Sequence, residues 1–383
     1  MSWFLRQQGA GKRQRIIERI CDAQNPVSID RILIVTFTEA AAAEMKERIA
    51  QALQKQAAKE PDNAHLQKQL TLIHNAFITT IHSFCLYLLR NHFHEILLDP
   101  SFRIAEEAEM KILKQEVVDA LFEKRLEEGS EAFHAFLEQY GGNLDIEPAK
   151  ERVLSLYEFS QCHAFPVRWM RECRAQMKEL TAENIGSTDW MQFLIRHENV
   201  VLGECAALNR QAMALAARDD GPTQYMDMLE DDKRFLEELM AATDMRSRNL
   251  IINEHSFQAL SRKSNPNQDE SIKAKVVQLR DILKTAIKDW KENMHFAPAE
   301  NLYGDCLAAL DNILTLFDVT EEFAMLFGNK KREKNLIDFS DMEHKALEIL
   351  WKEEDGALVV SDVAREYQAY FDEVMVDEYQ DSN

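Results

Sequence analysis

Three short apolar runs, far apart in the chain, constrain its fold more than any other feature. They end at Val35, Thr80 and Val376, and each is followed by polar or acidic residues. Apolar runs with such abrupt ends are typical of strands that are buried on both faces in a parallel sheet flanked by helices. Ligands bind at the carboxyl edge of such a sheet. We therefore predict an α/β fold whose functional residues directly follow these runs.

A long helical pattern separates the second run from the third. From about residue 104 to 335 apolar residues recur every three or four positions, and Gly or Pro breakers divide the pattern into helices. The prediction is a sheet domain with a large all-α insertion, divided into residues 1–103, 104–335 and 336–383. Two amphipathic helices should lead back to the last strand, one within 336–352 with Asp338 or Ser340 near its N-cap, and one at about 361–370.

Composition limits the class of protein. The chain has 45 Lys and Arg against 66 Asp and Glu, a net charge of -21, which argues against indiscriminate nucleic-acid binding but leaves room for a local basic groove. The basic cluster at 330–334 could contact DNA phosphates or form a solvated loop. Six cysteines are widely spaced without a metal-binding pattern, which indicates reduced thiols in a cytoplasmic protein. No apolar run approaches the length of a membrane span.

Paired carboxylates follow the last apolar run. In a nucleotide-hydrolysing site the first, Asp377, would hold Mg²⁺, and Glu378 would orient or deprotonate the attacking water. An acidic surface turn is the alternative, since charge runs are usually solvated.

A glycine-rich segment near the start of the chain resembles a phosphate-binding turn in part. Gly9-Ala10-Gly11-Lys12-Arg13 precedes apolar residues at helical spacing, so backbone N–H groups and Lys12 could meet ATP phosphates. The usual pattern has small residues where Arg6 stands and Ser or Thr where Arg13 stands, and no apolar strand precedes it. A basic turn without function remains an equal alternative.

Two further segments combine a strand end with the start of a helix. Thr36-Phe37-Thr38 precedes an alanine-rich helix, so the helix N-terminus could bind DNA phosphates while Phe37 stacks on a base. His82 and Ser83 follow Thr80 in the same way. Ordinary strand-to-helix connections and a structural histidine are the alternatives.

The strings at 36–49, 80–84 and 377–383 resemble motif Ia, the T-x-H-S-F motif and the Walker B motif (motif II) of UvrD/Rep-like superfamily-one DNA helicases. Residues 97–107 and 338–341 also resemble one subgroup, the AddA proteins of ATP-dependent helicase/nucleases. The resemblance implies a RecA-like P-loop NTPase sheet (domain 1A, incomplete) interrupted by a helical domain 1B. It further implies ATP and Mg²⁺ as cofactors and 3′-to-5′ movement along single-stranded DNA. Backbone contacts would come from His82 and Ser83, and Gln380 and Asp381 would couple the nucleotide to DNA.

The resemblance also implies a larger assembly. AddA proteins act on DNA ends in double-strand-break repair together with an AddB-like partner, and they carry a nuclease domain and a second RecA-like domain. Because this sequence stops just after motif II and lacks an upstream strand, we expect a fragment that is weak or inactive alone. The alternatives are a non-catalytic DNA- or partner-binding module and a remnant that does not fold.

Overall fold

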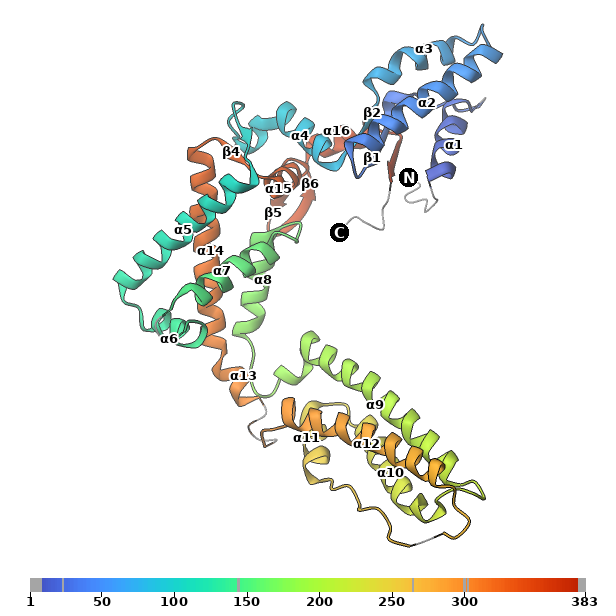
Figure 1. Ribbon diagram of the computed structural model, residues 1–383. Coiled ribbons are helices and arrows are strands. Elements are labelled where there is room, and N and C mark those ends of the chain that lie inside the picture. Colours follow the sequence, from blue (N-terminus) through green and yellow to red (C-terminus); the bar gives the residue numbers. More distant parts are fainter. Residues whose placement is uncertain are drawn as a thin grey trace. The chain divides into compact units, whose positions relative to one another are not determined.

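The computed structural model describes residues 9–22, 24–142, 145–263, 265–298, 301 and 303–377, which form two compact units. Unit 1 comprises Met1–Arg171 and Leu316–Asn383, and unit 2 comprises Glu172–Thr315. The fold is mixed α/β, with a small parallel sheet in unit 1 and helices through most of the chain (Figure 1). The structure thus confirms the prediction of a mixed α/β fold with a parallel sheet and mostly helical content.

The sheet of unit 1 contains the three predicted strands. In the part of the chain that the structure describes, its order is β2–β1–β7, and β1 pairs in parallel with both neighbours. The strands are β1 (Ile32–Thr36), β2 (Phe77–Thr80) and β7 (Glu373–Val376). The predicted strand ends at Thr80 and Val376 are confirmed, and β1 runs one residue beyond Val35.

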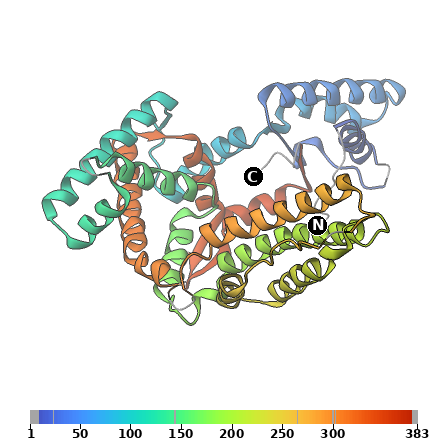
Figure 2. The same ribbon diagram turned by 60° about the horizontal axis from the view of Figure 1, so that its bottom comes forward.

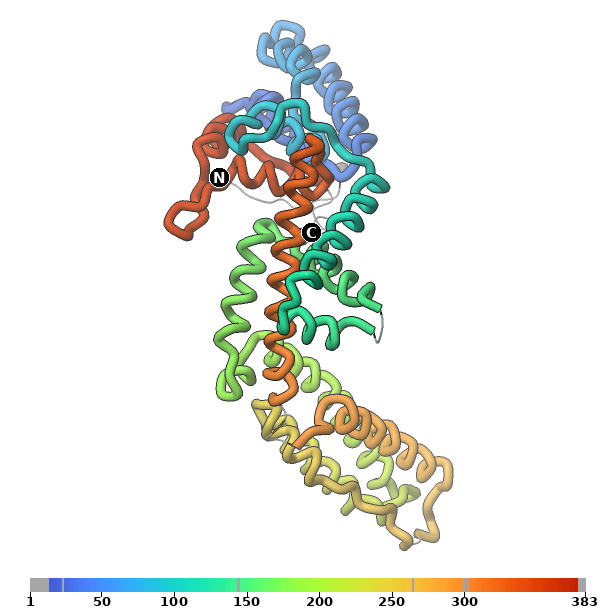
Figure 3. Tube along the Cα trace, turned by 90° about the vertical axis from the view of Figure 1, so that its left-hand side faces the viewer, coloured from blue at the N-terminus to red at the C-terminus, as the bar shows by residue number. Residues whose placement is uncertain are grey.

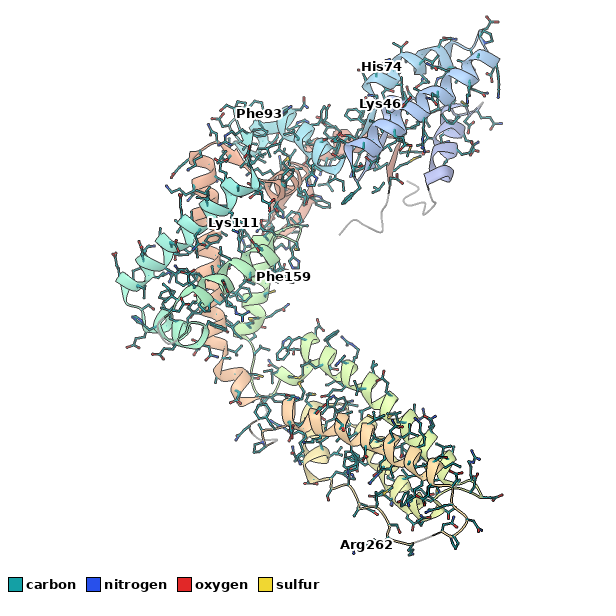
Figure 4. All side chains as sticks on the ribbon, viewed as in Figure 1. Lys46, His74, Phe93, Lys111, Phe159 and Arg262 are labelled. Carbon is teal, nitrogen blue, oxygen red and sulfur yellow. The ribbon has the colours of Figure 1, made fainter. Side chains whose placement is uncertain are left out.

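Helices cover both faces of β1, which explains its uninterrupted apolar sequence. Ile32 and Ile34 belong to a core shared with α1 and α2, whereas Leu33 and Val35 pack with Phe371 on the opposite side. On the first side, Lys46 Nζ in α2 also donates to the backbone oxygen of His74 at 2.8 Å (Figure 4). The helices next to the sheet are α1 (Gly9–Ile20), α2 (Glu39–Lys59), α3 (Ala64–Leu72), α4 (Ile81–His92) and α16 (Asp362–Tyr370).

The remainder of unit 1 is built mainly around an aromatic core. Phe122, Phe133, Phe136, Phe323 and Phe327 are all fully or almost fully buried. They come from α5, α6 and the second half of α14, and Figure 3 shows α5 crossing α14. The helices here are α5 (Glu107–Glu128), α6 (Glu131–Tyr140), α7 (Glu147–Ser160), α8 (Pro166–Lys178) and α14 (Leu310–Glu333).

A two-residue parallel ladder joins the two ends of the predicted insertion. It pairs β3 (Arg103–Ile104) with β4 (Leu336–Ile337). The helix predicted within 336–352 is α15 (Phe339–Leu350), and its N-cap is Asp338, which forms a capping box with Asp341. The helix predicted at about 361–370 is α16, and Ser361 is its N-cap.

An antiparallel hairpin in unit 1, formed by β5 (Trp351–Glu354) and β6 (Ala357–Val360), was not predicted. Its turn residues, Asp355 and Gly356, have φ values of 50° and 77°. Two positive φ values in a two-residue loop are typical of a type I′ turn, and Asp-Gly is a strong sequence signal for it. The signal was present in the sequence.

Unit 2 consists of helices and connecting loops, with no strand in its described part. Helices α9 and α12 lie side by side (Figure 2) and share buried apolar residues with α10 and α11. The predicted breakers fall between helices, for example Gly221-Pro222 between α9 and α10. The helices are α9 (Asp189–Ala216), α10 (Met226–Ala241), α11 (Met245–Glu254), α12 (Glu270–Asn293) and α13 (Gly304–Ala308). Short 3-10 helices in the two units are η1 (Ile29–Arg31), η2 (Ile73–Asn75), η3 (Phe93–Ile96), η4 (Ile185–Ser187) and η5 (Thr223–Tyr225).

Candidate functional site

The strand register brings three of the predicted segments to one edge of the sheet. Thr36 lies opposite Thr80, and Val35 lies opposite Val376. The backbone N–H of Asp377 then donates to the oxygen of Val35 at 2.7 Å, which continues the ladder by one residue. Thr80 and Thr36 therefore end two strands, and Asp377 follows the third, at the carboxyl edge of three adjacent parallel strands. Ligands of α/β sheets bind at this edge.

The turn between β1 and α2 exposes an aromatic ring at this edge. Thr36 is 2% exposed, and its hydroxyl donates to the backbone oxygen of Thr38 at 3.1 Å. Thr38 is the N-cap of α2, and its hydroxyl oxygen accepts from the N–H of Ala41. The two threonines thus fix the turn internally, while Phe37 between them is 68% exposed. Such a ring can stack on a planar ligand.

A second turn, from β2 into α4, is tied to the first by Glu39. The Thr80 hydroxyl donates to Glu39 Oε1 at 3.0 Å, and Ser83 Oγ donates to the same oxygen at 2.5 Å. Thr80 is also the N-cap of α4, since its hydroxyl oxygen accepts from the Ser83 N–H. Glu39 is the first residue of α2, where the helix dipole favours a negative charge.

His82 is held by a different carboxylate. Its Nε2 lies 3.2 Å from Glu343 Oε1 in α15, and its ring meets that of Phe339 edge-on at 5.4 Å between centroids. The side chains of His82 and Glu343 are 46% and 48% exposed. This half-exposed pair links α4 to α15, and the same two helices also share buried apolar residues.

The glycine-rich segment differs from the predicted turn. Gly9 to Arg13 are the first residues of α1, and nothing is described of their side chains. Glycine costs about 1 kcal/mol relative to alanine inside a helix. Here the helix is anchored further along, because Ile16 and Ile20 are fully buried against the sheet. The other end of α1 meets β7, where Arg19 forms an ion pair with Glu373.

Comparison with known proteins places the sequence of this chain in a family. The model of the UvrD/REP helicase N-terminal domain matches residues 8–214 and 231–383. The chain belongs to the UvrD/REP helicase N-terminal domain family. It is also 42% identical to the AddA protein of the ATP-dependent helicase/nuclease from Lachnoclostridium phytofermentans, over 98% of its own length and 28% of that protein. Proteins of the same name from Clostridium botulinum (strain Alaska E43 / Type E3) and Acetivibrio thermocellus are 36% and 35% identical, each over 98% of this chain and 31% of the relative.

The UvrD/REP family chain thus spans less than a third of these relatives. Three predicted site residues, Glu378, Gln380 and Asp381, lie outside the described residues. Within the described ranges no group of three or more His, Cys, Asp or Glu side chains could hold a metal ion. Among those same residues, no helix is long and apolar enough to cross a bilayer.

Sequence reasoning missed the two carboxylates that contact Ser83 and His82. Glu39 lies 44 residues from Ser83 in sequence, and Glu343 is on a helix that follows the whole insertion. No periodic pattern in the sequence predicts either contact, because each joins segments that are far apart in the chain.

The basic cluster does not form the solvated loop that was one of its two predicted alternatives. Lys330, Lys331 and Arg332 lie in the last turn of α14 rather than in a loop. Lys331 is 5% exposed, pairs with Asp338 and Asp341 at 2.9 and 2.7 Å, and lies over the Phe327 ring. Its ammonium group therefore forms ion pairs within unit 1.

Proposed function

We propose that this chain forms the nucleotide- and DNA-contacting N-terminal part of an AddA-like, ATP-dependent 3′-to-5′ DNA helicase. The observation that carries the proposal is the alignment of Thr80, Thr36 and Asp377 along one carboxyl edge. In this proposal the sheet is the RecA-like domain 1A. Residues 104–335 form domain 1B, bounded by the β3–β4 ladder at its two ends.

The position of Asp377 fits a role with Mg²⁺. Mg²⁺ is bound through one or two carboxylates together with substrate phosphates and water, so a dense acidic cage is not required. When bound, the ion would neutralise phosphate charge and orient the nucleotide. Asp377 would hold it, Glu378 would orient the attacking water, and Gln380 and Asp381 would link the nucleotide to DNA.

The packing of α1 supports a role for its first turn in phosphate binding. Arg19, in the last turn, pairs with Glu373, the first residue of β7. Twelve helical residues extend about 18 Å, whereas four strand residues extend about 13 Å. A helix that runs back along β7 from this ion pair therefore delivers its N-terminus, with Lys12, toward the edge that carries Asp377. Free N–H groups at that terminus attract anions.

The DNA strand would lie across the turns after β1 and β2. Phe37 is exposed for stacking on a base, and base–aromatic stacking is worth about 1–3 kcal/mol. Thr36 and Thr38 would hold the turn that presents this ring. His82 and Ser83 would contact the backbone of the strand. In the full-length relative, a nuclease domain and an AddB-like partner would act together with this part on DNA ends.

The test is DNA-stimulated ATP hydrolysis by the purified chain. We expect slow hydrolysis that single-stranded DNA accelerates, and loss of that activity in the Asp377→Ala/Glu378→Ala double variant. Equal rates in both proteins would remove the catalytic part of the proposal. Salt-dependent DNA binding without nucleotide affinity would instead favour the non-catalytic binding module, for which Arg13 in place of Ser or Thr is the motivating feature.

A further inference from the structure

Both side chains proposed to contact the DNA backbone already have carboxylate partners. Ser83 Oγ donates to Glu39 Oε1 at 2.5 Å, and His82 Nε2 lies 3.2 Å from Glu343 Oε1. We propose that Glu39 and Glu343 occupy the donors that a DNA phosphate needs, and so weaken and tune DNA binding as competitors built into the chain. This inference rests on the proposed function, because it concerns the affinity of that same edge.

The hydroxyl groups at the start of α4 have no proton left for a phosphate while Glu39 is in place. A serine or threonine hydroxyl has a single O–H donor. Ser83 and Thr80 both direct theirs at Glu39 Oε1, and the Thr80 oxygen in addition accepts the Ser83 N–H. A phosphate oxygen can therefore reach these donors only after the carboxylate has moved away. Glu39 is exposed, so it has solvent to move into.

Glu343 has the same relation to His82 from the other side of α4. Nε2 is the imidazole nitrogen that faces Glu343, and the ring is further positioned by Phe339. The side chains of the histidine and the glutamate are each about half exposed, so neither is locked in the core. Two separate helices, α2 and α15, thus each place one carboxylate on the N-terminal turn of α4, where free N–H groups and the dipole attract anions.

The competition has two parts that can be separated experimentally. One is competition for a hydrogen-bond donor, because the carboxylate and the phosphate accept from the same group. The other is repulsion between two negative charges, which salt screens over about 10 Å at 0.1 M. Removing the charge alone should remove the second part, and removing the side chain should remove both.

The experiment measures binding of the full chain to a fluorescent single-stranded oligonucleotide by anisotropy, across a salt series. We expect Glu39→Gln and Glu343→Gln each to bind about threefold or more tightly at low salt, with the gain shrinking as salt is raised. Glu39→Ala should bind more tightly than Glu39→Gln, because it also frees the two hydroxyls. The matched controls are Glu47→Gln on α2 and Glu348→Gln on α15, which remove the same charge away from the α4 turn.

A second substitution tests the assignment to Ser83. Ser83→Ala should weaken DNA binding less in the wild-type chain, where Glu39 competes for the hydroxyl, than in a chain that lacks Glu39. In the Glu39→Ala background the same change should cancel much of the gain. Thermal unfolding of each variant shows whether the fold is retained, and an effect confined to stability would contradict a role in DNA binding.

Several results would overturn this inference. Weaker DNA binding by Glu39→Gln and Glu343→Gln would show that the carboxylates orient the donors for DNA. An equal gain in the Glu47→Gln and Glu348→Gln controls would reduce the effect to net charge. If Phe37→Ala weakens binding while the Glu39 and Glu343 variants match wild type, this inference fails and the proposed function stands. If no variant binds DNA, both fail.

Discussion

The carboxyl edge of the sheet and the interior of unit 2 use the same kinds of side chain in opposite ways. In unit 2, Asp232 and Glu198 are 0% and 2% exposed and pair with Arg280 and Arg248, which are equally buried. At the edge, Glu39 accepts from the neutral hydroxyls of Thr80 and Ser83, and Glu343 contacts a half-exposed histidine. A buried ion pair cannot exchange partners without leaving a charge in an apolar medium, whereas an exposed carboxylate can move into water. The contrast separates charges that stabilise the fold from charges available for binding.

Breaking a buried pair in unit 2 should have the largest effect. Arg280 makes two hydrogen bonds to Asp232, at 2.6 and 3.0 Å. Asp232→Ala leaves the guanidinium buried without its partner, which should cost about 3–5 kcal/mol of unfolding free energy. Chemical denaturation monitored by circular dichroism measures this loss.

The control for this prediction replaces both partners. Asp232→Leu/Arg280→Met removes both charges and keeps apolar volume, so its stability should lie much nearer to wild type. Glu39→Ala, at the exposed edge, should change stability far less than Asp232→Ala. Equal losses for these two single variants would contradict the distinction between the two regions.

Exposed aromatic rings provide the next comparison. Phe37 is 68% exposed at the sheet edge, and Phe193 is 62% exposed on α9. Neither Phe→Ala change should alter stability by more than about 0.5 kcal/mol, because little surface is buried. Phe37→Ala should weaken single-stranded DNA binding by about 1–3 kcal/mol, the usual value of one stacked base. Phe193→Ala should leave DNA binding unchanged, and equal losses would place the DNA contact elsewhere.

The sequence predicted local features of both regions but not the contacts between distant segments. Apolar runs located β1, β2 and β7, and breakers located the ends of the helices, because those signals are local. The partners of Ser83 and His82 could not be predicted, because they depend on how α2 and α15 pack around α4. The environment of Lys331 was not predicted for the same reason, since its carboxylate partners, Asp338 and Asp341, lie beyond the end of its own helix. The roles of Asp377 and Phe37 remain predictions.

Helix caps extend the comparison to a smaller effect. Thr80 caps α4 at the edge, and Thr188 caps α9 in unit 2, each accepting a backbone N–H three residues on. Replacing either by Ala should cost about 1 kcal/mol of stability. Thr80→Ala should also change DNA affinity, because it removes one of the two hydroxyls on Glu39. Chemical denaturation measures the stability of both variants, and fluorescence anisotropy measures their DNA affinity. An equal change in DNA affinity for Thr188→Ala would show that loss of a helix cap, and not loss of the hydroxyl on Glu39, causes the change.

The smallest effect concerns an exposed ion pair at the opposite end of the sheet. The hydrogen bond from Arg31 lowers the pKa of Asp372, so the folded chain holds this carboxylate in its charged form more strongly than the unfolded chain does. The resulting stabilisation is present above the unfolded pKa, near pH 4, and is lost as the pH falls through the lower folded pKa. We expect wild type to lose a small advantage over Asp372→Asn in acid. Because the pair is about 40% exposed, raising the salt concentration at neutral pH should also reduce that advantage.

Glu198 in unit 2 supplies the contrast for this last prediction. Burial alone would raise its pKa, but hydrogen bonds from His295 and Arg248 together lower it below its usual value. The sign of the acid effect is therefore the same as for Asp372. The advantage of wild type over Glu198→Gln should nevertheless resist salt, since counterions do not reach a side chain that is 2% exposed. If salt reduces both advantages equally, then Glu198 is accessible to solvent ions and the division between exchangeable edge charges and fixed interior charges does not hold.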